Sequence, residues 1–153
     1  MAYTTINKSS DHFNTKLYVG NNSTNAITGV GFQPDWVWIK DRDTAYHHIL
    51  SDAVRGVNKE IRADTDESES TRTNNFNSFD SDGFTLGNGT DSQRINNNND
   101  NFVSWNWKAG NSAGSSNSDG SITSTVSANT TSGFSIVKYA GTGASATVGH
   151  GLG

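Results

Sequence analysis

Four carboxylates lie close together in one polar stretch of the chain: Asp64, Asp66, Glu67 and Glu69. Glycoside hydrolysis requires two carboxylates about 5 to 9 Å apart, usually on rigid strands. The surrounding segment, Ala63–Ser78, has few large apolar residues, and this composition favours a solvated loop. We therefore expect no enzymatic activity, and a glycan depolymerase remains only a disfavoured alternative.

Carboxylates and histidines also occur at spacings that invite a test for metal binding. Calcium needs six to eight oxygen ligands, more than an Asp-x-Asp-Gly turn supplies, and aspartate is common as a turn cap. The chain has no cysteine, which excludes thiolate zinc sites and disulfides. We expect no metal and no cofactor. The residues considered are Asp41, Asp43, His47, His48, Asp52, Asp80 and Asp82.

Sugar recognition would need exposed rings beside amide and carboxylate groups. Predicted loops offer three rings, and the asparagine-rich segment Asn96–Asn101 offers polar groups. The four tryptophans occur as W-x-W pairs on strong strand signals in a chain poor in Leu and Val, so we expect them to form the core. The candidate glycan contacts are Tyr46, His47, Phe76, Asn98 and Asp100.

Short alternating segments separated by turn residues would position these side chains. The strongest strand signals are Trp36–Lys40 and Phe102–Lys108, and Trp36–Lys40 is apolar on both faces, as expected of a central strand. His48–Arg55 fits helix or strand, and we favour a strand ending at Gly56. Further strands are predicted at Phe13–Gly20, Ala26–Phe32, Phe79–Gly87 (around an Asp-Gly turn), Ser121–Val126 and Gly133–Tyr139.

Composition narrows the class of protein. The 153 residues include 20 Ser, 17 Thr, 19 Asn and 16 Gly, which fill turns and solvent-facing strand positions. Eleven Lys and Arg against 15 Asp and Glu, without a basic cluster, argue against nucleic-acid binding. No apolar run is long enough to span a bilayer, and Met1–Lys8 lacks signal-peptide features. The pattern predicts an all-β antiparallel β-sandwich or jelly roll.

The two ends of the chain resemble each other. Phe13, Tyr18 and Gly20 match Phe134, Tyr139 and Gly141 at an offset of 121, and 26–32 then matches 146–152 at an offset of 120. The last 20 residues would then be the first two strands of a second unit of about 120 residues.

This repeat leaves three readings open. The chain is cut from a longer protein, the C-terminal strands complete this domain, or they add to a neighbouring protomer by strand exchange. The Gly/Ser-rich segment Ala109–Gly120 would give the reach for exchange. Under the exchange hypothesis, the candidate assembly residues are Phe134, Ile136, Tyr139 and Val148.

The strings GVGFQPDWVWIKDRD (Gly29–Asp43), FDSDGFTLG (Phe79–Gly87) and FVSWNWKAG (Phe102–Gly110) resemble a domain of structural proteins of tailed bacteriophages. That domain is similar to the concanavalin A-like lectin/glucanase jelly roll and to SPRY-type sandwiches. The resemblance covers about residues 13 to 110. The resemblance implies a unit that occurs in tandem on tail fibres or other virion-surface parts. The matching motifs consist mostly of sheet and turn residues, so they indicate the domain and not a functional site.

We therefore expect a polar segment at 1–12, a sandwich at 13–110, a linker at 111–120 and C-terminal strands at 121–153. The expected function is that of a non-catalytic virion structural module. It would act at the virion surface by self-association through its C-terminal strands or by contact with other virion proteins, and it would also bind a cell-surface carbohydrate. The alternative is a lectin-type receptor-recognition domain, whose essential event is carbohydrate capture.

Overall fold

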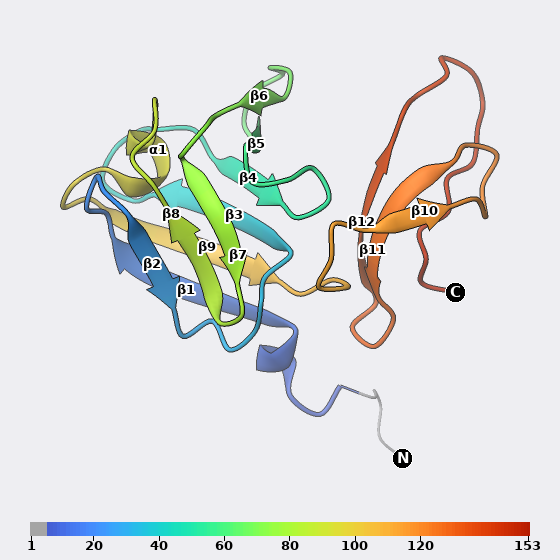
Figure 1. Cartoon of the computed structure of the whole chain (residues 1–153), viewed down its shortest axis with the longest axis horizontal. Helices are drawn as coiled ribbons and strands as arrows, with labels where there is room; N and C mark the ends of the chain where they lie inside the picture. Colours follow the sequence, from blue (N-terminus) through green and yellow to red (C-terminus); the bar gives the residue numbers. More distant parts are fainter. Residues whose placement is uncertain (1–5) are drawn as a thin grey trace.

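The computed structural model describes residues 6–153 as three antiparallel β-sheets: two are stacked, and the third, which we call the C-terminal layer, lies at one end of the stack (Figure 1). In spatial order the middle sheet consists of β1 (Phe13–Val19), β9 (Asn101–Trp107), β3 (Trp36–Asp41), β4 (Ile49–Asp52), β5 (Lys59–Arg62) and β6 (Ser70–Thr71). The inner layer consists of β2 (Asn25–Thr28), β8 (Gly83–Leu86) and β7 (Phe76–Asp80). The C-terminal layer consists of β10 (Ser115–Asn117), β11 (Ser124–Asn129) and β12 (Phe134–Tyr139).

Helix is confined to two short turns in the described residues, a 3-10 turn at Ser9–Asp11 and α1 at Gln93–Asn96. The predicted fold class, an all-β antiparallel sandwich, is confirmed. No helix in residues 6–153 is long and apolar enough to cross a membrane. The expected N-terminal polar segment lies partly outside the described residues.

Alternation along β3 and β9 gives the middle sheet two different faces. Val37 and Ile39 on β3 point to the inner layer, on what we call the inner face, whereas Trp36 and Trp38 point to the opposite, outer face. β3 pairs with β9 on one side and β4 on the other, so the prediction of a central strand is correct. The ambiguous segment 48–55 is a strand only in part: Ile49–Asp52 forms β4, whereas 53–55 is a turn, so the strand ends before the predicted Gly56.

The sealed core lies between the middle sheet and the inner layer. Phe84 and Leu86 from β8 meet Ile39 and Phe102 across this interface, and all four are fully buried. The ring of Phe76 stacks on Phe84 with centroids 5.3 Å apart. Burial of such side chains contributes about 1.5 to 3 kcal/mol each, so this layer holds most of the apolar stabilisation.

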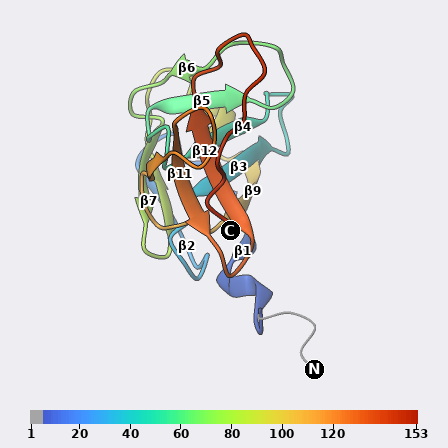
Figure 2. The same ribbon diagram turned by 90° about the vertical axis from the view of Figure 1, so that its right-hand side faces the viewer.

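The C-terminal layer joins the rest of the molecule at one end of the outer face. Figure 2 shows β11 and β12 crossing in front of the middle sheet. Phe134 on β12 stacks on Trp36, with ring centroids 5.7 Å apart. Asp35 fixes the connection, because one of its carboxylate oxygens accepts hydrogen bonds from the backbone N–H groups of Ala109 (2.7 Å) and Asn111 (2.9 Å).

The expectation that the four tryptophans form the core is wrong. They are half-buried on the outer face and do not belong to the buried core cluster. On β9 the fully buried side chains are Phe102, Ser104 and Asn106, on the opposite face from Trp105 and Trp107. The strand assignment was correct, but the choice of buried face was wrong, since period-two alternation alone does not say which face a second layer closes.

Two segments expected to be irregular contain strands. The predicted loop 63–78 includes β6 and the start of β7, and the predicted linker includes β10, which pairs with β11. β5 was not predicted at all. These strands are short and carry polar side chains, so their hydrophobic periodicity is weak; pairing with a neighbouring strand holds them.

Candidate functional site

A row of aromatic rings runs across one end of the outer face. Phe13 packs on Trp107 (ring centroids 4.8 Å apart), Trp107 on Trp36 (4.8 Å), and Trp36 on Phe134 (5.7 Å). These residues align because Phe13 and Trp36 both pair with Trp107 in the sheet register. The row is therefore where the C-terminal layer docks on the sandwich.

Beyond this row, strands β1, β9 and β3 carry on the outer face what we call the open patch: Leu17, Val19, Trp38, Val103 and Trp105. Its two tryptophan rings lie 5.5 Å apart, and Trp38 donates a hydrogen bond from Nε1 to Nδ1 of His48 (2.9 Å). The ring contacts made by β12 fall on the aromatic row and not on these two tryptophans. The open patch is thus an apolar and aromatic surface beside the docked layer.

The exposed apolar side chains concentrate on two edge strands. Leu17 and Val19 on β1 are 60% and 54% exposed, and Phe13 on the same strand is 38% exposed. Tyr139 on β12 is 56% exposed. β1 is the last strand of the middle sheet and β12 the last strand of the C-terminal layer, so each has one edge without a strand partner in the described chain. Unpaired edges with apolar side chains are prone to pair with another chain.

Polar loops border the open patch where β3 ends and β9 begins. Asp43 accepts hydrogen bonds from the backbone and side-chain N–H groups of Asn101 (2.7 and 2.8 Å), and these lower the pKa of the Asp43 carboxyl. Asp100 accepts a hydrogen bond from the hydroxyl of Thr44 (3.1 Å). These contacts bind the loop after β3 to the loop before β9.

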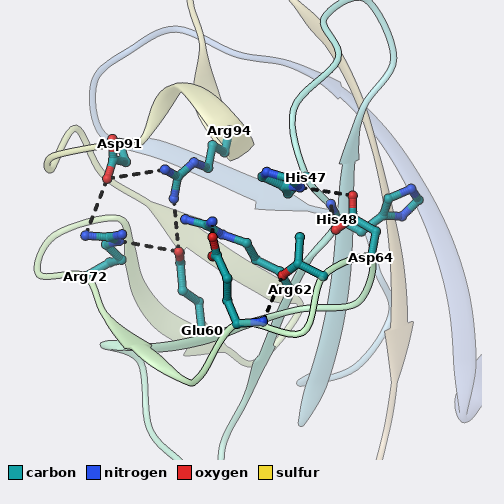
Figure 3. Close-up of polar contacts among 10 residues, drawn as sticks. His47, His48, Glu60, Arg62, Asp64, Arg72, Asp91 and Arg94 are labelled. Carbon is teal, nitrogen blue, oxygen red and sulfur yellow. Dashed lines mark hydrogen bonds and ion pairs between the residues drawn. The ribbon is translucent and has the colours of Figure 1, made fainter.

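A network of arginines and carboxylates ties β5 and β6 to α1 (Figure 3). Buried Glu60 accepts a hydrogen bond from Arg72 (3.5 Å) and one from Arg94 (3.3 Å). Asp91 contacts the same two arginines at 3.4 and 3.5 Å. Removing one member would leave a buried charge without its partner, so we interpret the network as structural.

The acidic run considered for hydrolysis is engaged in similar contacts. Asp64 binds His47 (3.1 Å), Glu67 binds Arg62, and Glu69 lies 3.5 Å from Arg55 and 3.4 Å from Lys59. Within residues 6–153, no group of three or more His, Asp or Glu side chains could hold a metal ion.

The candidate glycan contacts separate into two sets. Tyr46 and His47 are half-buried in the loop after β3. Asp100 contacts the same loop through its hydrogen bond with Thr44, and Asn98, two residues before Asp100, is exposed. Phe76 is the exception, because it lies on β7 in the sealed core and is 2% exposed. The expectation that Phe76 is a surface loop residue was wrong, since a polar sequence context concealed a core strand.

Three of the candidate assembly residues lie on β12. Phe134 docks on the sandwich, Ile136 lines a groove of about 410 Å³ between β12 and the outer face, and Tyr139 is exposed beside that groove. Trp36, Leu50 and Ile61 supply its apolar floor. Val148 instead forms an isolated bridge with Ile122. Leu17 and Val19 were missed, although their alternation with Tyr18 was a signal that one face of β1 is apolar.

Comparison with known proteins gives a family but no characterised relative. No curated protein and no solved structure matches the chain. A family model described as a domain of unknown function (DUF7483) matches residues 8–153. Since the match spans nearly the whole chain, the protein belongs to the DUF7483 family.

Proposed function

We propose that this domain is a non-catalytic structural module of a virion surface, such as a tail fibre of a tailed bacteriophage, and that it works by protein–protein assembly. The observation that carries the proposal is the gathering of exposed apolar side chains, Phe13, Leu17, Val19 and Tyr139, on two edge strands. Such edges suit a surface that another protein covers. The resemblance of the motifs to phage structural domains supports the setting, and we assign the sandwich to the concanavalin A-like jelly rolls on the same ground.

Light scattering of the intact chain tests the assembly. We expect a discrete oligomer or filament for the natural sequence and a smaller mass for the double variant Leu17→Ser, Val19→Ser. Thr15→Ser is the matched control, because Thr15 is exposed on the same strand and already polar. Circular dichroism shows that each variant is folded. A monomer for the natural sequence at all concentrations, or equal masses for the double variant and the control, would overturn the proposal.

Carbohydrate binding is the second candidate, favoured by the rings of Trp38 and Trp105 beside polar loops that carry Tyr46 and Asp100. Aromatic rings offer apolar faces for a sugar ring, and nearby amides and carboxylates can bind its hydroxyls. Hydrogen exchange with a panel of bacterial surface polysaccharides checks it. Binding predicts slower exchange in residues 42–48 and 97–101, and unchanged exchange with every polysaccharide would reject it.

A further inference from the structure

The repeat within the sequence can be compared with what each matched residue does in the structure. Gly20, which follows β1, is closely packed: a Cβ there would lie 2.0 Å from the carbonyl oxygen of Asn97. Its backbone N–H donates to the carbonyl of Asp100 (2.9 Å). Gly141, the matching residue after β12, has no atom within 4 Å of such a Cβ. The glycine is required at the first position and has no steric reason at the second.

The matched tyrosines differ in the same way. Tyr18 donates a hydrogen bond from its hydroxyl to the carbonyl of Ile95 (2.7 Å) and stacks on Phe102 with centroids 5.2 Å apart. Burial raises its pKa. Tyr139 is exposed, and its hydroxyl has no hydrogen-bond partner in the described chain. β12 therefore carries features that have a role at β1 and none where β12 lies.

We propose that β12 is a second β1 and takes the β1 position of another copy of this chain, beside that copy's β9. The proposal rests on the proposed assembly function and names its partner: a second copy, joined by strand exchange. Tyr139 and Gly141 would then occupy the places of Tyr18 and Gly20. Because donor and acceptor surfaces differ, successive exchanges would build a ring or a filament.

The sequence of β12 suits the β1 position. At the same offset, Ile136 and Val137 replace Thr15 and Lys16, and β-branched apolar residues favour strands. The match weakens beyond Gly141, where Thr147 corresponds to buried Ile27, so we assign the exchange to the strand alone.

The displaced β1 can take the position that β12 leaves, beside β11 of the donor copy. Phe13 and Phe134 contact the same ring, that of Trp107, at 4.8 and 6.3 Å. A β1 strand moved beside β11 of the donor copy would bring Phe13 to the ring stack that Phe134 leaves. The β11–β12 turn, which contains Gly133 at φ +69°, is the hinge that must open. Every strand keeps a partner in this reciprocal arrangement.

Engineered cysteines give a direct test, since the natural chain has none. Lys16 pairs with Ser104 in the β1–β9 ladder, and Val137 corresponds to Lys16. The two single variants Ser104→Cys and Val137→Cys are mixed, unfolded together, refolded and oxidised. Exchange predicts a 104–137 disulfide between the two chains, because directly opposed residues of an antiparallel pair lie within disulfide reach. Without exchange, residue 104 is fully buried on the inner face, away from β12.

The control mixture pairs Ser104→Cys with Lys138→Cys, whose side chain would point to the other face of the exchanged strand. The 104–137 product should exceed the 104–138 product severalfold. A second pair, Val103→Cys with Lys138→Cys, reports the same register on the outer face if the buried substitution at 104 prevents folding. If the chain is an oligomer but neither the 104–137 nor the 103–138 disulfide forms, the exchange is overturned and the proposed assembly stands. If the chain is a monomer and neither disulfide forms, both proposals are overturned. Equal yields of the 104–137 product and the 104–138 control product also overturn the exchange.

Discussion

On the inner face of the middle sheet Val37, Ile39 and Phe102 are fully buried, whereas the larger tryptophans of the outer face stay half-buried. The inner layer closes the first face with Phe84 and Leu86 along its central strand. The C-terminal layer covers only part of the second face: Phe134 stacks on Trp36 and Trp107, and a groove remains between β12 and the sheet. Side-chain size therefore does not decide which face becomes the core. The face that a full second layer covers becomes the core, and the partly covered face keeps its large rings half-buried.

Truncation in the sealed core should have the largest effect. Phe84→Ala removes a fully buried ring that contacts Phe76 and Tyr18, and we expect the free energy of unfolding to fall by about 3 to 5 kcal/mol. Chemical denaturation measures it. A loss below about 1 kcal/mol would mean that the inner interface is not the main core.

Truncation on the outer face should cost less. Trp36→Ala removes a half-buried ring, and we expect a loss of about 1.5 kcal/mol, roughly half of the upper value for a fully buried large side chain. The same denaturation experiment applies, with hydrogen exchange to follow β11 and β12. The variant should loosen the C-terminal layer, because Trp36 stacks on Phe134, while β8 keeps its protection. Equal loosening of both layers would contradict the comparison.

The sequence predicts the strands that carry large apolar side chains and misses the short polar ones. The strands at Trp36 and Phe102 were found because aromatic and β-branched residues alternate there. β5 and β10 were not found, since they are short and polar and owe their form to pairing with neighbours. The buried face of β9 was assigned wrongly because Ser104 and Asn106 are polar. The Asn106 amide is held in the core by hydrogen bonds from its Nδ2 to the carbonyl of Asn14 (3.1 Å) and the hydroxyl of Ser104 (3.1 Å), whereas its Oδ1 has no hydrogen-bond partner in the described residues.

The candidate site was less predictable. Phe134 and Tyr139 could be singled out, because a repeat is visible in the sequence itself. Exposure of Leu17 could not, because it depends on β1 being the last strand of its sheet, which is a matter of topology. Phe76 was misplaced because its neighbours are polar: Asn75 precedes β7, and Asn77 and Ser78 lie on the strand itself.

Acid should weaken the folded state through its anchored loops. The backbone N–H groups of Gly31 and Gly29 lower the pKa of Asp82, and the backbone and side-chain N–H groups of Asn101 lower the pKa of Asp43. A carboxyl whose pKa is lower in the folded chain than in the unfolded chain stabilises the folded state at pH values above its unfolded pKa, near 3.8. This stabilisation is lost as the pH falls through the folded pKa. Asp35 acts with the opposite sign, because burial raises its pKa.

Thermal unfolding between pH 7 and pH 2 measures this dependence. We expect the midpoint to be nearly constant down to about pH 5 and to fall below it. Asp82→Asn should flatten the acid limb, since position 82 then no longer titrates. An unchanged slope in that variant would mean that the turn anchored by Asp82 opens before the rest of the domain unfolds.

The smallest effect on folding is expected in the open patch. Leu17→Ser alters a side chain that is mostly exposed, so the free energy of unfolding should change by less than about 0.5 kcal/mol. Denaturation of the variant at concentrations where it is monomeric checks this. A larger loss would show that the C-terminal layer or a neighbouring loop covers Leu17 in solution.

The register between the first and ninth strands has a mechanical consequence. Phe13 pairs with Trp107, so the chain enters β1 and leaves β9 at the same end of one antiparallel ladder. Tension pulling these two points apart would load the seven pairs of this ladder one after another, as in opening a zipper, instead of shearing them together. The pair at Phe13 and Trp107 would open first. Tyr18, which packs on the sealed core, pairs with Phe102 near the other end of the ladder, so the core would be reached only after most pairs had opened.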